Sequence, residues 1–142
     1  MNDSLPVLGF VTVHVADVWR TQQWYQDVFG MRPQYLAPDG SYVELVGPGF
    51  VLALCTHVLG RHCCGDGVRP TSLLEPAVGC HLSFFTVDLA ATYAQALLHG
   101  AVGLSAPASR PWGRNEACVR DINGRLVVLL ETEEPRPAVP AV

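Results

Sequence analysis

The sequence contains no lysine and few charged residues of either sign. All nine basic residues are arginines, charged residues make up 15% of the 142, and the formal net charge is −4 at pH 7. Such a chain has no basic face for nucleic acid, so we expect no nucleic-acid partner. Hydrophobic residues make up 49%. This fraction can bury enough apolar surface to offset the entropy of ordering, which excludes disorder for the chain as a whole.

Long hydrophobic runs are also absent. The uninterrupted apolar runs are far shorter than the roughly 20 residues that a membrane helix needs, and the start, Met1 to Ser4, lacks the basic character of a signal peptide. We therefore expect a cytoplasmic protein with no membrane partner. The five cysteines are then expected to be reduced thiols, and the length fits one domain spanning residues 1–142.

The first half of the chain predicts one strand, one helix and three further strands. The helix signal is clear, because Asp17 can cap its start and Gly30 can end it. Turn sequences rich in Gly and Pro separate the later strands. The predicted elements are a strand at Phe10–Val15, a helix at Val18–Phe29 and strands at Pro33–Leu36, Tyr42–Val46 and Phe50–Cys55.

The same order returns in the second half, after a Gly- and Pro-rich segment from His57 to Val78 that is predicted as a loop. Asp88 and Gly100 repeat the roles of Asp17 and Gly30. The predicted elements are a strand at His81–Val87, a helix after Asp88, and strands at Val102–Ser105, Asn115–Arg120 and Leu126–Glu131.

This internal repeat predicts an α+β fold made of two tandem βαβββ modules. Module one covers about residues 8–56, a linker loop about 57–79, and module two about 80–132. The Pro-rich tail, residues 133–142, is predicted to be disordered. We expect the curled mixed sheets of the two modules to surround a cleft.

Short motifs in both halves resemble those of the vicinal oxygen chelate superfamily, which includes glyoxalases, extradiol dioxygenases and bleomycin-resistance-type drug-binding proteins. Module one carries them at Val13–Asp17 and Trp24–Gly30. Module two carries them at Phe85–Leu89, Pro111–Arg114 and Val119–Gly124, although Ile122 replaces a usual Pro and Arg125 a usual Asn. The resemblance implies a homodimer that exchanges modules, with clefts between module one of one chain and module two of the other.

Metal-dependent members of that superfamily resemble one another in placing one ligand on each of four strands. The resemblance maps those positions onto Phe10, Ala53, His81 and Val128. Only His81 can coordinate a metal, and one imidazole cannot hold Zn²⁺ or Fe²⁺, which need three or more protein ligands. The sequence therefore predicts no metal, no other cofactor and no catalytic residue.

An apolar cup with few polar groups is expected where the metal would lie, and such cavities bind flat or greasy ligands. Trp112 can stack on an aromatic ligand from a loop at the cleft mouth, with Tyr35 and Tyr42 as further stacking partners. The predicted ligand-binding residues are Trp112, His81, Phe10, Tyr35, Tyr42, Ala53, Ser83, Arg114 and Val128. For three of them a plainer role stays open: His81 as an ordinary lining residue, Trp112 as loop packing and Arg114 as a solvated surface charge.

We therefore expect a metal-free protein that sequesters an aromatic natural product or antibiotic, in the manner of drug-resistance or self-resistance proteins. The main alternative is an enzyme of the glyoxalase or dioxygenase type, either metal-independent with His81 as general acid or base, or metal-dependent through ligands placed elsewhere. A protein-interaction module with a vestigial pocket is a third possible function.

A zinc site is a further alternative, because several histidines and cysteines lie close in sequence, although without a standard ligand spacing. They are His57, His62, Cys63, Cys64, Cys80 and His81.

Overall fold

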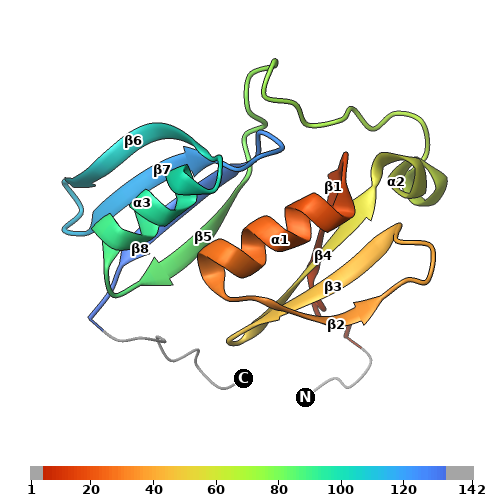
Figure 1. Cartoon of the computed structure of the whole chain (residues 1–142), viewed down its shortest axis with the longest axis horizontal. Coiled ribbons are helices and arrows are strands. Elements are labelled where there is room, and N and C mark those ends of the chain that lie inside the picture. Colours follow the sequence, from red (N-terminus) through yellow and green to blue (C-terminus); the bar gives the residue numbers. More distant parts are fainter. Residues whose placement is uncertain (1–4, 134–142) are drawn as a thin grey trace.

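Each half of the chain forms a four-stranded mixed sheet with one helix on its face, as the computed structural model describes for residues 5–133 (Figure 1). In module one the strand order is β1-β4-β3-β2, with β1 parallel to β4 and the other neighbours antiparallel. Its elements are β1 (Val11–Val15), α1 (Val18–Phe29), β2 (Arg32–Leu36), β3 (Tyr42–Gly47) and β4 (Phe50–Thr56).

Module two repeats this topology in the order β5-β8-β7-β6. Its elements are β5 (His81–Thr86), α3 (Leu89–Leu98), β6 (Val102–Ser109), β7 (Asn115–Arg120) and β8 (Leu126–Glu131). The predicted α+β fold of two tandem βαβββ modules is therefore confirmed. Strand β6 runs four residues beyond its predicted end at Ser105, because an edge strand tolerates the missing N–H of Pro107 and the register shifts that precede Ala108.

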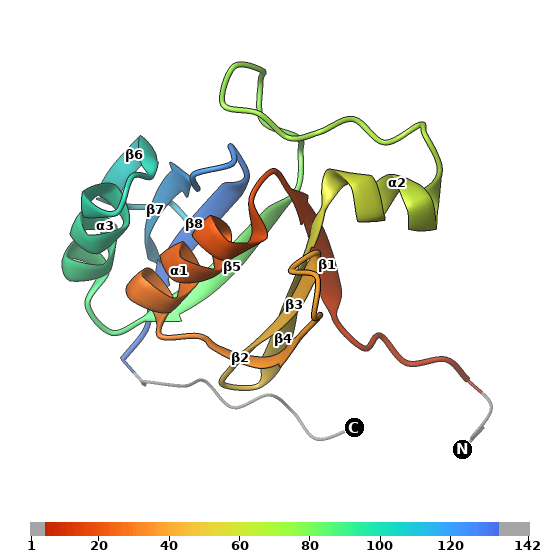
Figure 2. The same ribbon diagram turned by 45° about the vertical axis from the view of Figure 1, so that its right-hand side comes forward.

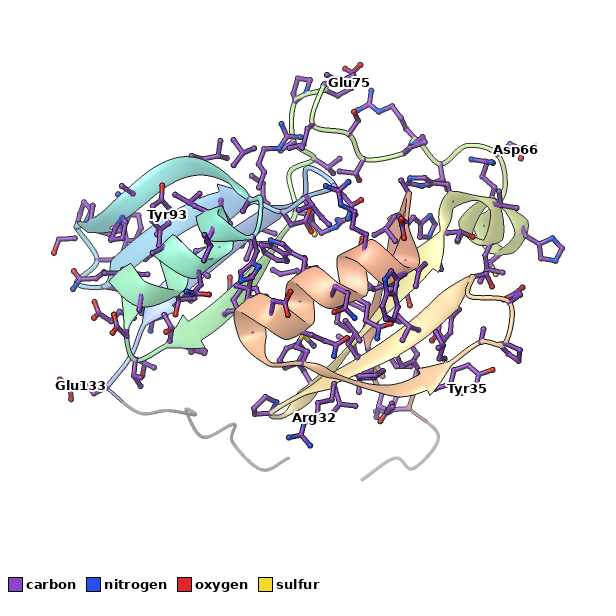
Figure 3. The ribbon with its side chains drawn as sticks, in the orientation of Figure 1. Arg32, Tyr35, Asp66, Glu75, Tyr93 and Glu133 are labelled. Carbon is purple, nitrogen blue, oxygen red and sulfur yellow. The ribbon has the colours of Figure 1, made fainter. Side chains whose placement is uncertain are left out.

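The linker begins with a helix, α2 (His57–Cys64), so the prediction of a loop from His57 is wrong for these eight residues. The Thr56 hydroxyl caps the helix by accepting a hydrogen bond from the Leu59 N–H at 3.1 Å. Farther along the linker, the Arg120 guanidinium donates to the carbonyls of Ser72 and Glu75, which ties the loop to module two. Figure 3 labels Glu75 in this loop. Of the predicted disordered tail, residues 134–142 lie outside the described residues.

The hydrophobic core is shared by the two modules. Alternate residues of β1 and β3 are buried against α1, and those of β7 and β8 are buried toward α3, as a period of two requires. In β4 four consecutive residues are buried, of which Leu52 and Leu54 belong to the core. Helix α1 lies between the two sheets (Figures 1 and 2). Its Phe29 ring stacks on Phe84 of β5 at a centroid distance of 3.7 Å.

Two motif residues lock the modules together. The Tyr25 hydroxyl of α1 donates to Asp121 Oδ2, in the β7–β8 turn, at 2.6 Å, and both residues are fully buried. Asp121 Oδ1 accepts from the backbone N–H groups of Asn123 and Arg125, and the Asn123 amide donates to Thr21 on α1. The motifs that carry the family resemblance thus contain a structural contact between α1 and the β7–β8 turn.

Each sheet leaves one face uncovered by α1 and α3, and we call it the open face of that module. The open faces of the two modules belong to separate sheets, with α1 between the sheets (Figure 2). Strands β1 and β5 are the edge strands of their sheets on the side away from β2 and β6. Among the described residues, no helix is long and apolar enough to span a membrane.

Candidate ligand-binding site

The open face of module two has an apolar centre with polar groups around it. Strand register places Ser83 beside Val128, and Phe85 beside Leu130. Leu130 in turn lies beside Glu116 on β7. A surface of this kind matches the predicted cup, because apolar area provides affinity and a few polar groups fix orientation.

Trp112 stands at the margin of this face, in the tight loop between β6 and β7. Backbone hydrogen bonds from Arg110 to Arg114 and from Gly113 to Arg110 close the loop, and Gly113 adopts a positive φ of 88° that favours glycine. The indole is 69% exposed, yet its Nε1–H donates to Glu116 Oε2 at 2.6 Å. The hydrogen bond holds the ring by its edge and leaves ring surface exposed to a ligand.

Two arginines beside Trp112 are already engaged within the chain. The guanidinium carbon of Arg114 lies 5.4 Å from the centroid of the Phe85 ring, at cation–π distance. Arg110 donates to the Ser105 hydroxyl at 2.7 Å. It also lies near Cys118, where burial raises the pKa of the thiol and the guanidinium opposes that rise. Arg114 therefore contacts Phe85 of the open face.

His81 begins β5 and is exposed on the same open face. Its register partner is Leu126 on β8, two positions along from the pair of Ser83 and Val128. Together with Trp112, these residues occupy one face of one module. The structure thus brings together the predicted site residues of module two.

The predicted site residues of module one gather on its own open face. Phe10 is exposed just before β1, and the rings of Tyr35 on β2 and Tyr42 on β3 lie 6.1 Å apart. Ala53 is fully buried. A ligand that touched Ala53 would have to displace the side chains that cover it.

Within one chain, α1 and the shared core separate the two groups of residues. The predicted site residues therefore form two groups, which we call half-sites. One lies on the open face of module one and consists of Phe10, Tyr35 and Tyr42. The other lies on the open face of module two and consists of His81, Ser83, Arg114, Val128 and Trp112. The expectation that the two faces meet in a cleft between chains stays a prediction.

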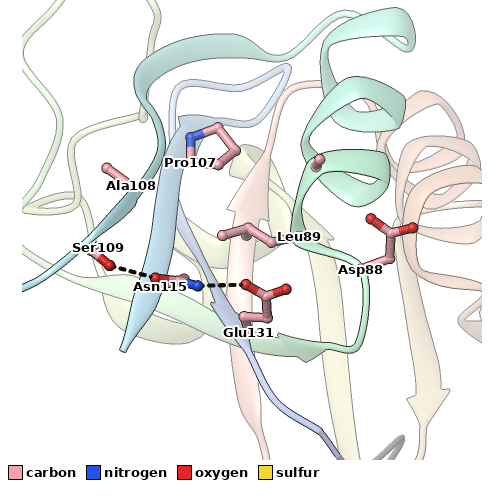
Figure 4. Close-up of a pocket in the computed structure, with 8 residues that line it drawn as sticks. Asp88, Leu89, Pro107, Ala108, Ser109, Asn115 and Glu131 are labelled. Atoms are coloured by element: carbon pink, nitrogen blue, oxygen red, sulfur yellow. Dashed lines mark hydrogen bonds between the residues drawn. The ribbon is translucent and has the colours of Figure 1, made fainter. Parts of the chain in front are cut away.

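Two open cavities lie at the end of module two where α3 begins and β8 ends. The one in Figure 4 has a volume of about 330 Å³ and is lined by the start of α3 and by Pro107, Ser109, Asn115 and Glu131. The Ser109 hydroxyl donates to Asn115 Oδ1 at 2.9 Å, and the Asn115 amide donates to Glu131 Oε2 at 3.0 Å. The neighbouring cavity, of about 510 Å³, shares Asn115 and Glu131 and includes Arg114. Of the predicted site residues, only Arg114 lines either cavity.

No group of three or more His, Cys, Asp or Glu side chains within residues 5–133 could hold a metal ion. This finding includes the cluster of histidines and cysteines from His57 to His81, so the zinc alternative has no geometric support there.

Sequence reasoning missed the two carboxylates of the half-sites, Glu44 and Glu116. Each lies on the third strand of its module and points to the open face, because Glu44 lies between the buried Val43 and Leu45 and Glu116 precedes the buried Ala117. The alternation of polar and apolar residues in Tyr42–Val46 and Asn115–Arg120 is the signal that could have found them. Their partners, Tyr42 and Trp112, were predicted as site residues without these contacts.

Comparison with known proteins defines the fold. Neither a protein-family profile nor a curated protein sequence matches the chain. Among solved structures, a glyoxalase/bleomycin resistance protein/dioxygenase family enzyme from Burkholderia phytofirmans PsJN is similar at a TM-score of 0.78 and 17% identity, over 89% of this chain and 98% of that one. A glyoxalase-related enzyme from Fulvimarina pelagi is similar at a TM-score of 0.77 and 18% identity, over 90% and 89% of the two chains.

A third similar structure is TioX from Micromonospora sp. ML1, with a TM-score of 0.64 and 19% identity, over 88% of this chain and 98% of that one. These likenesses cover almost the whole chain in each case. The protein therefore has the fold of the glyoxalase/bleomycin resistance protein/dioxygenase superfamily, as its motifs predicted.

Proposed function

We propose that this protein is a binding member of the vicinal oxygen chelate superfamily that sequesters an aromatic natural product or antibiotic. The observation that carries the proposal is Trp112, a largely exposed indole that a hydrogen bond to Glu116 holds at the edge of an apolar sheet face. An exposed large aromatic ring on a loop favours binding over packing. Orienting the ring in advance lowers the entropy lost when a ligand stacks on it.

The groups around Trp112 fit a flat ring system. Val128 and Leu130 provide apolar contact, and Phe85 adds a second aromatic ring that lies under the Arg114 guanidinium. Ser83 and His81 supply the few hydrogen-bonding groups that fix the orientation of a ligand in such sites. Aromatic pairs of this kind add about 0.5–1.5 kcal/mol beyond the area that they bury.

We further propose that the functional unit is a homodimer, in which module one of one chain faces module two of its partner. The two edge strands β1 and β5 favour such an arrangement, because exposed edges offer unpaired backbone groups to another chain. Both edges carry exposed apolar side chains. Phe10 precedes β1 and Val11 begins it, and Phe85 lies in β5 with Val87 just after it. A dimer of this kind would complete the cleft from the two half-sites.

Fluorescence titration with planar aromatic antibiotics tests the binding proposal. Trp112→Ala is compared with Trp19→Ala, a matched control because Trp19 is similarly exposed, at 64%, on α1. We expect Trp19→Ala to keep the affinity of the parent and Trp112→Ala to weaken it about tenfold, as the loss of one stacking contact predicts. Equal affinities for the two variants would remove Trp112 from the site and, with it, the main support for the proposal.

A further inference from the structure

Glu44 places a carboxylate in the middle of the open face of module one. On strand β3 it pairs with Ala53 of β4 on one side and with Tyr35 of β2 on the other. Its neighbours Val43 and Leu45 are fully buried on the helix side, so the alternation of the strand sends Glu44 to the open face, where it is half-buried. The carboxylate therefore belongs to the floor of the half-site.

Two uncharged donors fix the position of this carboxylate. The Tyr42 hydroxyl donates to Oε2 at 2.8 Å, and the Gln34 amide donates to Oε1 at 3.0 Å. Burial, followed by the influence of Glu44, raises the pKa of Tyr42 to about 12, so the phenol stays a neutral donor at physiological pH. Both donors orient the carboxylate without neutralising it, and each oxygen keeps a further acceptor site.

No positively charged side chain compensates Glu44 within the described part of the chain. The ion pair found there joins His99 to Asp27, on the two helices and away from this face. The sequence has no lysine. A half-buried carboxylate with oriented oxygens and no counter-charge favours a cation as its next partner, because a charge-assisted hydrogen bond is about twice as strong as a neutral one.

Aromatic rings lie beside the carboxylate. A register irregularity between Pro33 and Tyr35 lets two consecutive side chains, Gln34 and Tyr35, reach Glu44 and Tyr42 from the same strand. The rings of Tyr35 and Tyr42 are inclined by 54°, and Tyr35 is half exposed. An anionic group combined with tilted, accessible rings is the chemistry that recognises an organic cation.

From this arrangement we infer that the open face of module one recognises the cationic group, a quaternised ring nitrogen or an ammonium, of the aromatic ligand. The inference rests on the proposed function in one respect: the same ligand would stack its ring system on Trp112 of module two. Module two itself differs in character, because its open face carries arginines, Arg110 and Arg114, near Trp112. Module one would thus bind the cationic group of the ligand, and module two would stack on its ring system.

The test uses two probes of nearly the same shape, N-methylacridinium, which is a permanent cation, and acridine, which is uncharged at mildly alkaline pH. Their dissociation constants are measured for the full chain and for Glu44→Gln, which keeps the shape of the side chain and can still accept from Tyr42. We expect the parent to prefer the cation and Glu44→Gln to lose that preference, with cation affinity about tenfold lower and acridine affinity unchanged. Added salt should weaken the binding of the cation and leave that of acridine unaffected.

Asp39→Asn is the matched control, because it removes the same charge from an exposed position in the β2–β3 turn, where Asp39 accepts from Ser41. Equal preference in Glu44→Gln and the parent would overturn the inference while leaving the proposed function intact. Loss of the preference in Asp39→Asn as well would also overturn it, because the effect would then come from net charge. Failure of both probes to bind the parent would count against both proposals.

Two further results distinguish the cation site from the stacking proposal and from a role of Glu44 in dimer formation. If Trp112→Ala binds the cation as well as the parent and Glu44→Gln does not, the cation site stands and the stacking proposal fails. If Glu44→Gln instead shifts the monomer–dimer equilibrium and keeps the parent's preference between probes, Glu44 pairs with an arginine of a second copy and the inference is wrong. Sedimentation at several protein concentrations gives the second readout.

Discussion

At the scale of single residues, two of the family-like motifs are joined by one buried hydrogen bond, between Tyr25 and Asp121. Tyr25 and Asp121 lie 96 positions apart in the sequence, and their hydrogen bond joins α1 to the turn between β7 and β8 inside the shared core. The carboxylate satisfies the phenol and two backbone N–H groups at once. Buried polar groups must be paired in this way, since an unpaired one costs about 1–3 kcal/mol.

Tyr25→Phe tests the strength of this contact. The change removes one hydrogen bond to a buried carboxylate, so we expect the free energy of unfolding to fall by about 1.5–3 kcal/mol. Urea denaturation followed by circular dichroism measures the difference. Tyr93→Phe on α3 is the control for removing a phenol hydroxyl elsewhere, and a Tyr25→Phe protein no less stable than this control would show that the contact contributes little.

Tyr42 gives a prediction about pH. Its pKa in the folded protein is raised from 10.0 to about 12, so the unfolded chain loses this proton at a lower pH than the folded chain does. The stabilisation from the neutral phenol is therefore complete below about pH 10 and is lost as the pH rises toward 12. Burial also raises the pKa of Tyr25, so more than one phenol ionises late. Ultraviolet absorbance of tyrosinate against pH should show a late step near pH 12 that is missing in Tyr42→Phe. A titration curve of the same shape in the variant would contradict the assignment.

At the scale of elements, the sequence predicted most of the fold because its signals were local. Asp17 and Asp88 accept from the backbone N–H of Arg20 and Ala91 as capping residues do, and α1 ends at Gly30 as predicted. Helix α2 was not predicted, because its sequence, HVLGRHCC, lacks a clear apolar period and runs into a Gly- and Pro-rich segment. The sequence did not predict the contact between Glu116 and Trp112, because it depends on the geometry of the β6–β7 loop. Nor did it predict the contact between Glu44 and Gln34, because it depends on the register shift in β2.

Gly60 on α2 shows how tightly this helix covers the end of module one. A Cβ atom at Gly60 would collide with the His14 ring on β1. Beside it, Cys55 of β4 is buried, and burial together with Cys63 and Cys64 of α2 raises the pKa of its thiol. Helix α2 therefore shields one end of the open face of module one from solvent.

Gly60→Ala should displace α2 and expose Cys55. We expect a faster reaction of this thiol with an aromatic disulfide reagent, measured as an additional rapid phase, and a stability loss of about 1–3 kcal/mol from overpacking. Cys63 and Cys64 are replaced by Ser in the background to leave Cys55 easier to follow. Gly67→Ala, where an added Cβ meets nothing within 4 Å, should react as the parent does. Equal rates in both variants would mean that α2 does not protect Cys55.

At the scale of the whole molecule, one chain carries two half-sites on separate sheets, with α1 between the sheets. The repeat in the sequence predicted two modules, but no pattern of residues could show that α1 would lie between the two sheets. That arrangement follows from contacts far apart in sequence, such as Phe29 with Phe84 and Thr21 with Asn123. The position of the half-sites is therefore a property of the tertiary packing.

A homodimer should appear in sedimentation as a particle of twice the 15.4 kDa of one chain. Val11→Lys places a charge on the exposed edge strand β1, and we expect it to shift the equilibrium toward the monomer because charged edges resist pairing. Val58→Lys changes an equally apolar exposed residue on α2 and should leave the dimer intact. A parent protein that sediments as a monomer at all concentrations would contradict the dimer proposal.

The measurement that tests the central claim most directly combines binding with recovery of the ligand. A planar aromatic compound that quenches tryptophan fluorescence is bound to the parent protein at saturation, incubated, released by denaturation and weighed by mass spectrometry. The account predicts saturable binding, weakened in Trp112→Ala and preserved in Trp19→Ala, with the compound recovered unchanged. A compound chemically altered by the parent protein, or binding indifferent to Trp112, would contradict it.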